Sequence, residues 1–132
     1  MALLFLDIDG FKEVNDIYGH NIGDMVLQNI AERLRFCIRE SDIIARIGGD
    51  EMTVILSKII EREDAALVAR KIIDSINPEF RIENVSCSIG VSVGISIFPD
   101  DGKETETLLK KADIAMYQVK ESGKNGFRFF GN

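Results

Sequence analysis

Tryptophan is absent from this sequence of 132 residues, and histidine, cysteine and proline occur only once, twice and twice. Two cysteines are too few for a small disulfide-stapled scaffold. Because Cys37 and Cys87 lie in apolar-patterned segments, we expect both to be reduced core residues. The lone histidine, His20, has no second histidine or paired cysteines nearby and does not suit a zinc site. A chain of this length can bury a hydrophobic core as one domain without metal or disulfide support.

Positive charge is also in deficit, with 16 Lys+Arg against 22 Asp+Glu and a net charge of −6. This balance excludes a domain that binds nucleic acid by bulk charge, whereas a small phosphorylated ligand needs only a few local cations. No apolar run approaches the ~20 residues of a membrane helix. The opening residues lack the basic region and cleavage site of a signal peptide. We therefore expect a cytoplasmic domain without nucleic-acid or membrane contacts, including the case of a cytoplasmic part of a membrane-anchored protein.

Hydrophobic periodicity predicts alternating strands and helices. In the segment 86–98, bulky apolar residues alternate with Ser and Gly, and we expect the small face to allow close packing by a helix or loop rather than ligand contact. The order of elements predicts an α/β (α+β) fold with a mixed, mostly antiparallel sheet and packed helices. The predicted strands are 3–8, 42–47, 52–57, 86–98 and 127–130, and the predicted helices are 11–18, 24–40, 61–76 and 104–121.

Two pairs of acidic residues fall at strand ends. Asp7 and Asp9 end the first strand, and Asp50-Glu51 lies at the tip of the central hairpin. Such groups can converge because neighbouring strands lie about 5 Å apart. Magnesium binds one or two carboxylates together with substrate phosphates. Each pair alone is equally typical of a solvated loop, so both interpretations stay open at this point.

Several other polar residues allow two interpretations. Lys12 follows a possible phosphate-binding turn at Gly10-Phe11, where free backbone N–H groups favour anions. Lys120 and Lys124 end the last helix, where a cation also interacts favourably with the helix C-terminus. Asp24 alone is best interpreted as the N-cap of the following helix.

Four ordered blocks resemble the GGDEF family, the diguanylate cyclases. Residues 6–20 (LDIDGFKEVNDIYGH) are similar to the family's opening signature, with Gly23-Asp24 at the family spacing. Residues 46–52 (RIGGDEM) resemble the naming motif, with Met in the last place. Residues 88–91 (SIGV) and 112–120 (ADIAMYQVK) match later blocks. The resemblance covers nearly the whole chain.

The resemblance implies a ferredoxin-like domain related to the polymerase palm and to class III nucleotidyl cyclases. Such a domain condenses two GTP molecules into cyclic di-GMP and releases two pyrophosphates. Each domain holds one GTP, and two domains meet face to face in a transient homodimer. Each 3′-hydroxyl then attacks the α-phosphate of the other GTP.

The resemblance also implies roles for individual residues. Mg²⁺ or Mn²⁺ would be held by Asp7, the Ile8 carbonyl, Asp50 and Glu51, with Asp50 and Glu51 as the catalytic carboxylates. The phosphates would contact Lys12, Lys120, Lys124 and the backbone at Gly10-Phe11, beside the hairpin glycines Gly48 and Gly49. Asn15 and Asp24 would bind the guanine edge.

An R-x-x-D motif precedes the hairpin. Arg39 and Asp42 stand where the family binds inhibitory cyclic di-GMP, and Arg70 stands where the family often adds an arginine to that site. The alternative is a helix C-terminal cation with a surface ion pair, which contributes little.

Two departures from the family pattern leave the activity open. Met52 replaces Phe or Tyr at the last position of the motif, and the family's first helix is missing ahead of Met1. We expect residues 1–132 to be a single domain cut from a longer protein with an upstream sensory part and a downstream EAL domain. The chain is then either an active cyclase or a degenerate module that binds GTP or cyclic di-GMP.

Overall fold

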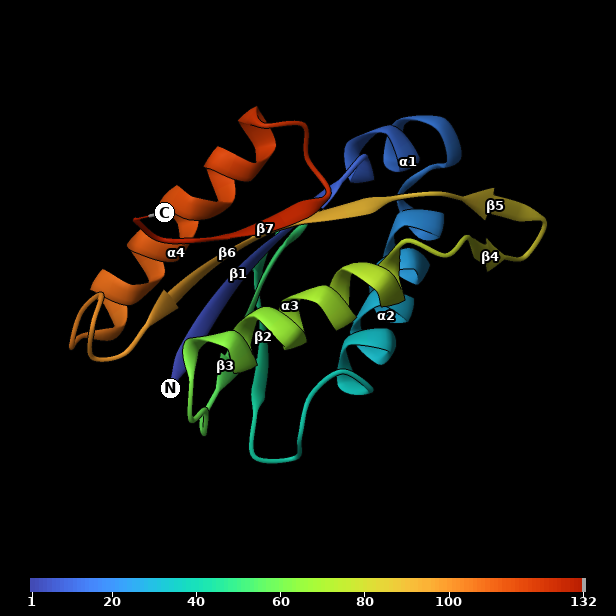
Figure 1. Cartoon of the computed structure of the whole chain (residues 1–132). Helices are drawn as coiled ribbons and strands as arrows, with labels where there is room; N and C mark the ends of the chain where they lie inside the picture. The colour runs from blue at the N-terminus through green and yellow to red at the C-terminus, as the bar shows by residue number, and fades with distance from the viewer. Residues whose placement is uncertain (132) are drawn as a thin grey trace.

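A computed structural model describes residues 1–131, and Figure 1 labels its elements. Helices and strands alternate much as the periodicity predicts. The strands are β1 (Ala2–Asp9), β2 (Ile43–Gly48), β3 (Glu51–Leu56), β4 (Phe80–Ile82), β5 (Val85–Cys87), β6 (Gly90–Ile97) and β7 (Gly126–Phe129). The helices are α1 (Phe11–Tyr18), α2 (His20–Arg35), α3 (Arg62–Ile76) and α4 (Thr105–Glu121).

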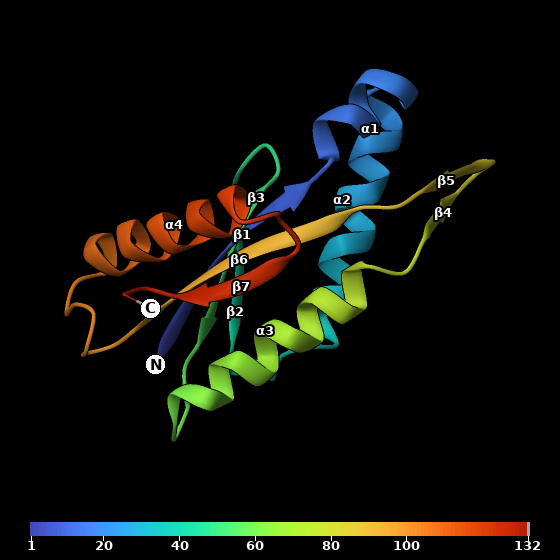
Figure 2. The ribbon, with the colours of Figure 1, turned by 45° about the horizontal axis from the view of Figure 1, so that its top comes forward.

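In the described part of the chain, five strands form one sheet in the order β2-β3-β1-β6-β7. The pairs β2–β3, β3–β1 and β1–β6 are antiparallel, and β6–β7 is parallel. Strands β1, β2, β3 and β6 with helices α2 and α3 form the βαββαβ arrangement of ferredoxin-like folds. Helix α4 and strand β7 are added to it (Figure 2). The predicted mixed, mostly antiparallel fold is therefore confirmed.

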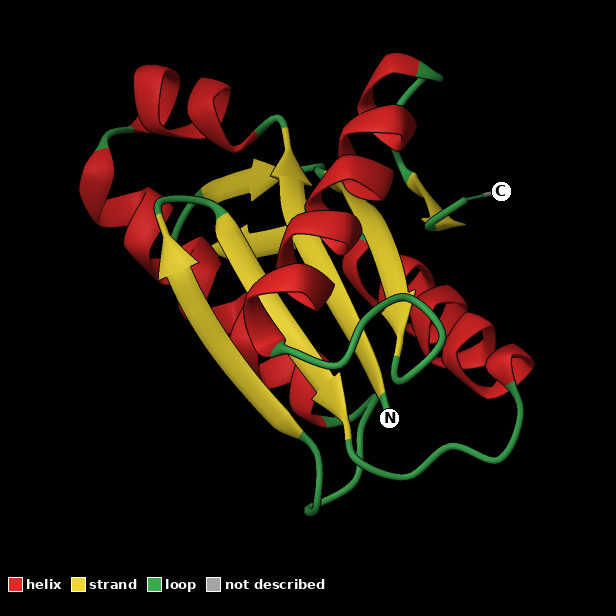
Figure 3. Ribbon diagram, turned by 90° about the vertical axis from the view of Figure 1, so that its left-hand side faces the viewer, coloured by secondary structure: helices red, strands yellow, loops and turns green. Residues whose placement is uncertain are grey.

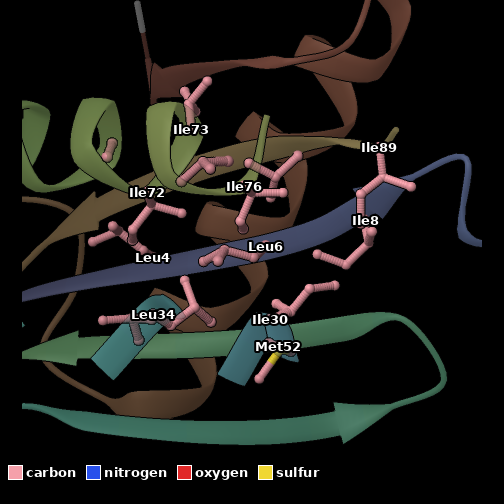
Figure 4. Packing of buried hydrophobic residues seen from close by; sticks show 14 of the residues in the cluster. Leu4, Leu6, Ile8, Ile30, Leu34, Met52, Ile72, Ile73, Ile76 and Ile89 are labelled. Carbon is pink, nitrogen blue, oxygen red and sulfur yellow. The ribbon is translucent and has the colours of Figure 1, made fainter. Parts of the chain in front are cut away.

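The central strand β1 divides its side chains between two faces of the sheet. Leu4, Leu6 and Ile8 belong to the core beneath α2 and α3 (Figure 4), whereas Leu3 and Phe5 pack with α4 on the other face. Figure 3 shows α4 lying across that second face. Because successive strand residues alternate between faces, Asp7 and Asp9 continue the α4 face toward the end of the strand.

The small face of β6 lets α4 lie close to the sheet. The Ser96 hydroxyl donates to the Leu108 carbonyl at 2.8 Å. A Cβ at Gly94 would clash with the Ala112 carbonyl oxygen and the Met116 amide nitrogen. Over the middle of β6, the expected role of the small residues in helix packing is confirmed.

The structure corrects the bounds of two predicted elements. Helix α2 runs from His20 to Arg35 rather than over 24–40. It begins early because Gly19 alone, at φ 92°, turns the chain from α1 into α2. Asp24 therefore lies inside the helix, and the N-cap interpretation was wrong. The predicted strand 86–98 is broken after Cys87, and its first part pairs with β4 in a separate hairpin. Three-residue strands are too short to show an alternating pattern.

Both cysteines are free, with Cys87 buried and Cys37 half-buried, as expected for reduced core residues. Among residues 1–131, no helix combines the length and the apolar character that crossing a membrane requires.

Candidate active site

The two acidic pairs lie at the same end of the sheet. Asp7 on β1 is the register partner of Glu51 on β3, so their side chains share the α4 face. The Ile8 amide donates to the Asp50 carbonyl oxygen at 3.1 Å and holds the hairpin tip against β1. The structure thus brings together the four residues that the family resemblance suggested as metal ligands.

Lys120, in the last turn of α4, reaches down onto this acidic end. Its Nζ lies 3.2 Å from Asp7 Oδ1 and 2.6 Å from Asp9 Oδ1. The simple alternative, a cation that only caps the helix C-terminus, does not describe these contacts. The long packing of α4 along β6 and β1 places the side chain there.

Sequence reasoning missed a group of residues around Asp9. This carboxylate is 8% exposed, and it accepts hydrogen bonds from the Ser92 hydroxyl at 2.8 Å and from the Asn125 amide at 2.9 Å, besides Lys120. Asp9 was expected beside Asp7 at the strand end, and the alternation along β1 places both on the same face, but no separate role was predicted for it. Nothing in the sequence marks Ser92 or Asn125.

The site carries an excess of negative charge that shifts its protonation. Burial raises the pKa of Asp7 to about 6, and the charges of Asp50 and Glu51 add to this effect against the opposing influence of Lys120. The pKa of Glu51 is also raised, first by burial and then by the charges of Asp113 and Asp50. A nearby cation would therefore favour the charged form of both carboxylates and lower their pKa values.

Lys120 shows the complementary shift. Burial alone would lower its pKa, but the hydrogen bond to Asp9 and the charges of Asp7 and Asp9 outweigh burial and raise the pKa. The lysine stays charged, and it compensates part of the acidic cluster.

The hairpin tip is open on its outer side. A Cβ at Gly48 or Gly49 would meet no described heavy atom within 4 Å, and Gly49 has a φ of 52°. Arg46 Nε donates to the Gly49 carbonyl at 3.1 Å and restrains the turn. A ligand can therefore approach the tip backbone closely.

Helix α1 begins directly beside this end of β1. Gly10, with a φ of 84°, precedes it, and among the described residues no side chain caps its first turn. The leading N–H groups are thus available for an anion. Lys12 is exposed in the same turn, and Lys124 is exposed in the loop after α4 with a φ of 66°.

Asn15 and Gly23-Asp24 meet where α1 and α2 join. A Cβ on Gly23 would clash with the Asn15 amide oxygen and lie 2.9 Å from its Cγ, so the absence of a side chain at Gly23 gives Asn15 its place. Asp24 is exposed in the following position of α2. The structure therefore brings the two suggested guanine-binding residues to neighbouring positions.

The donor set suits a hard divalent cation. Across residues 1–131, no group of three His, Cys, Asp or Glu side chains forms a ready-made metal cluster. Magnesium commonly takes only one or two protein carboxylates and completes its shell with phosphates and water. Asp7, Asp50, Glu51 and the Ile8 carbonyl offer oxygen ligands only, so these residues fit Mg²⁺ or Mn²⁺.

The R-x-x-D residues lie elsewhere, at the far end of α2. The Asp42 carboxylate accepts the Arg39 amide at 3.0 Å and the Ser57 amide at 3.1 Å, so Asp42 also ties this turn to the end of β3. Arg39 and Asp42 border an open groove of about 630 Å³ between α2 and α3. Arg70 does not join them among the described lining residues, and its guanidinium instead lies 5.4 Å from the Phe127 ring centre.

Met52 occupies a core position on the opposite side of β3. Its side chain is 5% exposed and belongs to the same core cluster as Ile30 of α2 (Figure 4). The departure from the family motif therefore changes packing beneath the sheet, while Glu51 next to it keeps its position on the α4 face.

The sheet is ferredoxin-like, and Asp7 and Glu51 face each other at the ends of β1 and β3 with Lys120 beside Asp7. Residues 1–126 match the family model described as "Diguanylate cyclase, GGDEF domain". The chain belongs to the GGDEF domain family.

Known proteins are similar to this chain in sequence, and a solved GGDEF domain is similar to it in fold. The chain is 46% identical over 129 residues to the bifunctional diguanylate cyclase/cyclic di-GMP phosphodiesterase MucR of Pseudomonas aeruginosa, covering 98% of this chain and 19% of MucR. It is 36% identical over 130 residues to the cyclic di-GMP phosphodiesterase NbdA of the same organism, covering 98% of this chain and 16% of NbdA. The crystal structure of the GGDEF domain of TpbB (YfiN) from P. aeruginosa superposes with a TM-score of 0.96 at 40% identity, covering 99% of this chain and 82% of that one.

Proposed function

We propose that this chain is a diguanylate cyclase domain that condenses two GTP molecules into cyclic di-GMP and two pyrophosphates. The observation that carries the proposal is the meeting of Asp7, Glu51 and Lys120 on one face of the sheet beside an open glycine hairpin. The diguanylate cyclase TpbB, 42% identical over 129 residues, supports the same activity.

The acidic end of the sheet would hold the metal through Asp7, the Ile8 carbonyl, Asp50 and Glu51. When bound there, Mg²⁺ would neutralise triphosphate charge and make the α-phosphorus a better target for the 3′-hydroxyl by withdrawing charge from its oxygens. Glu51 would accept the proton of the attacking 3′-hydroxyl, a task that its raised pKa favours near neutral pH. Asp50, on the hairpin tip, would keep the tip backbone close to the substrate.

The chain's lysines would bind and orient the triphosphate. Lys120 already lies beside Asp7, and Lys12 and Lys124 are exposed in the chain segments that follow β1 and α4. The uncapped N–H groups after Gly10 would add neutral donors. Catalysis of this kind relies mainly on such positioning and charge stabilisation.

Two domains would have to meet, since each holds a single GTP. The open outer side of the hairpin tip leaves room for a second GTP-loaded domain to approach. In a face-to-face pair, each 3′-hydroxyl would attack the α-phosphate held by the other domain.

Guanine selectivity tests the proposed substrate. A carboxylate at Asp24 accepts from guanine N1–H and the exocyclic amine together, a pairing that adenine does not offer. We expect the domain to bind 3′-deoxy-GTP, which lacks the attacking hydroxyl, at least roughly tenfold more tightly than 3′-deoxy-ATP. Replacing Asp24 with Asn should bring the two affinities close together in calorimetry.

Asp16→Asn is the matched control, because Asp16 is exposed on the neighbouring helix α1. It should keep the guanine preference. A wild-type domain that binds both nucleotides equally would contradict the assignment of GTP as substrate.

We further propose that the groove at Arg39 and Asp42 binds cyclic di-GMP as a product inhibitor. Arg39→Ala is expected to weaken cyclic di-GMP binding at least severalfold in calorimetry, because it removes a charged hydrogen-bond donor. Arg39 is the better target, since Asp42 also closes its own turn. Arg81→Ala, on the exposed hairpin β4–β5, should leave affinity unchanged; equal affinity for Arg39→Ala would remove this site from the account.

A GTP- or cyclic di-GMP-binding regulatory module is the second candidate. Met52 favours it, and so does the relative NbdA, whose name gives only phosphodiesterase activity. The chain spans between 16% and 30% of the curated relatives MucR, NbdA and TpbB. We propose that it works in the cytoplasm beside sensory and EAL domains of a larger protein.

A further inference from the structure

We propose that Asp9 is a positioning residue that fixes Lys120 and the loop carrying Lys124 in their triphosphate-binding places. The inference rests on the proposed function, since it assigns a task within the same site. Asp9 itself lies under Lys120 rather than at the open hairpin tip, so it acts through the lysines and not on the substrate.

The contacts of Asp9 use both of its oxygens. Oδ1 accepts from Lys120 Nζ at 2.6 Å and from the Ser92 hydroxyl at 2.8 Å. Oδ2 accepts from the Asn125 backbone amide at 2.9 Å. Ser92 is fully buried, so the carboxylate cannot rotate away without leaving a buried hydroxyl unpaired.

The Asn125 contact restrains a strained loop. Lys124 and Asn125 have φ values of 66° and 50°, a left-handed conformation that is costly for lysine and that asparagine tolerates better. The Asn125 side chain also accepts the Val91 amide at 3.4 Å, so this turn is held to both β1 and β6. One carboxylate thereby fixes the backbone on which Lys124 stands as well as the Lys120 ammonium.

Asp9 also keeps Lys120 in place when Asp7 has another partner. Lys120 Nζ is closer to Asp9 than to Asp7, at 2.6 Å against 3.2 Å. An ammonium has three donors, so it can stay hydrogen-bonded to Asp9 and still donate to a phosphate. Asp7 is then free to serve as a cation ligand without loss of the lysine.

The test compares the affinities for guanosine and for 3′-deoxy-GTP, measured by calorimetry with Mg²⁺. Asp9→Asn keeps the shape of the side chain and removes its charge. We expect it to reduce the ratio of the affinity for 3′-deoxy-GTP to the affinity for guanosine at least tenfold, with guanosine affinity unchanged. Asp101→Asn is the matched control, because Asp101 accepts the Ile97 amide at 2.7 Å at the other end of β6; it should leave the ratio intact.

Two further variants separate positioning from folding. Ser92→Ala removes one hydrogen bond and keeps the charge, so it should lower the ratio by less than Asp9→Asn. In a Lys120→Gln background, Asp9→Asn should cost much less than it does in the wild type, because the two residues act as a unit.

The outcomes distinguish a failure of the Asp9 positioning role from a failure of the proposed function. An unchanged ratio in Asp9→Asn, or an equal fall in guanosine and 3′-deoxy-GTP affinity, would overturn the positioning role while the proposed function stands. A wild-type domain that binds 3′-deoxy-GTP no better than guanosine would overturn both.

Discussion

Replacing Glu51 with glutamine is expected to lower cyclic di-GMP formation by roughly 10²–10⁴-fold, the usual contribution of a general base, while GTP affinity stays nearly unchanged. Glutamine has the same shape but cannot accept the proton of the 3′-hydroxyl. Burial, together with the charges of Asp113 and Asp50, raises the pKa of Glu51 and brings it nearer to the pH at which a base works best. Chromatography of the products measures the first effect and calorimetry the second.

Glu104→Gln is the control for this variant. Glu104 is an exposed residue that precedes α4 at the opposite end of that helix and makes no capping hydrogen bond. Its substitution should leave turnover unaffected. Turnover in Glu51→Gln equal to the wild type would exclude Glu51 from the chemistry.

Asp7→Asn is expected to abolish activity and at the same time to stabilise the metal-free protein at neutral pH. The pKa of Asp7 rises from 3.8 to about 6 on folding, so the folded state binds more protons than the unfolded chain between these values. The free energy of unfolding therefore falls as the pH rises from about 4 to about 6. Removing the carboxylate should recover roughly 1–2 kcal/mol at pH 7.5, after allowance for solvent screening.

Thermal unfolding with and without Mn²⁺ measures the stability of the metal-free protein and the stability added by the metal. The wild type should gain stability with Mn²⁺, because the ion binds the folded state alone, and Asp7→Asn should lose most of that gain. In the presence of a chelator, the advantage of Asp7→Asn should shrink as the pH falls from about 6 toward 4. The exposed Asp16 on α1 supplies the control, since Asp16→Asn should change neither value. A full Mn²⁺ response in Asp7→Asn would show that Asp7 is not a metal ligand.

The sequence was most informative where the chain repeats a simple pattern. The alternation in β6 predicted both its direction of burial and the close approach of α4, which Gly94 and Ser96 allow. It failed at short elements: β4 and β5 have three residues each, and α2 starts only one residue after α1. In these places tertiary contacts, rather than periodicity, decide the structure.

The candidate site divides in the same way. The sequence alone showed that Asp7, Asp50 and Glu51 lie at strand ends that can converge, and the family resemblance suggested their roles. It could not reveal Ser92 and Asn125, which meet Asp9 only through the folding of β6 and the loop after α4. The family resemblance also grouped Arg70 with Arg39, whereas the structure places Arg70 over Phe127 on β7.

An end-point assay of this chain with GTP and Mg²⁺ over a range of protein concentrations tests the central claim most directly. The account predicts cyclic di-GMP with two pyrophosphates per product, at a rate that rises more steeply than linearly with protein concentration because two domains must meet. GTP recovered unchanged at every concentration, from a domain that still binds 3′-deoxy-GTP, would contradict the cyclase assignment and leave a nucleotide-binding module.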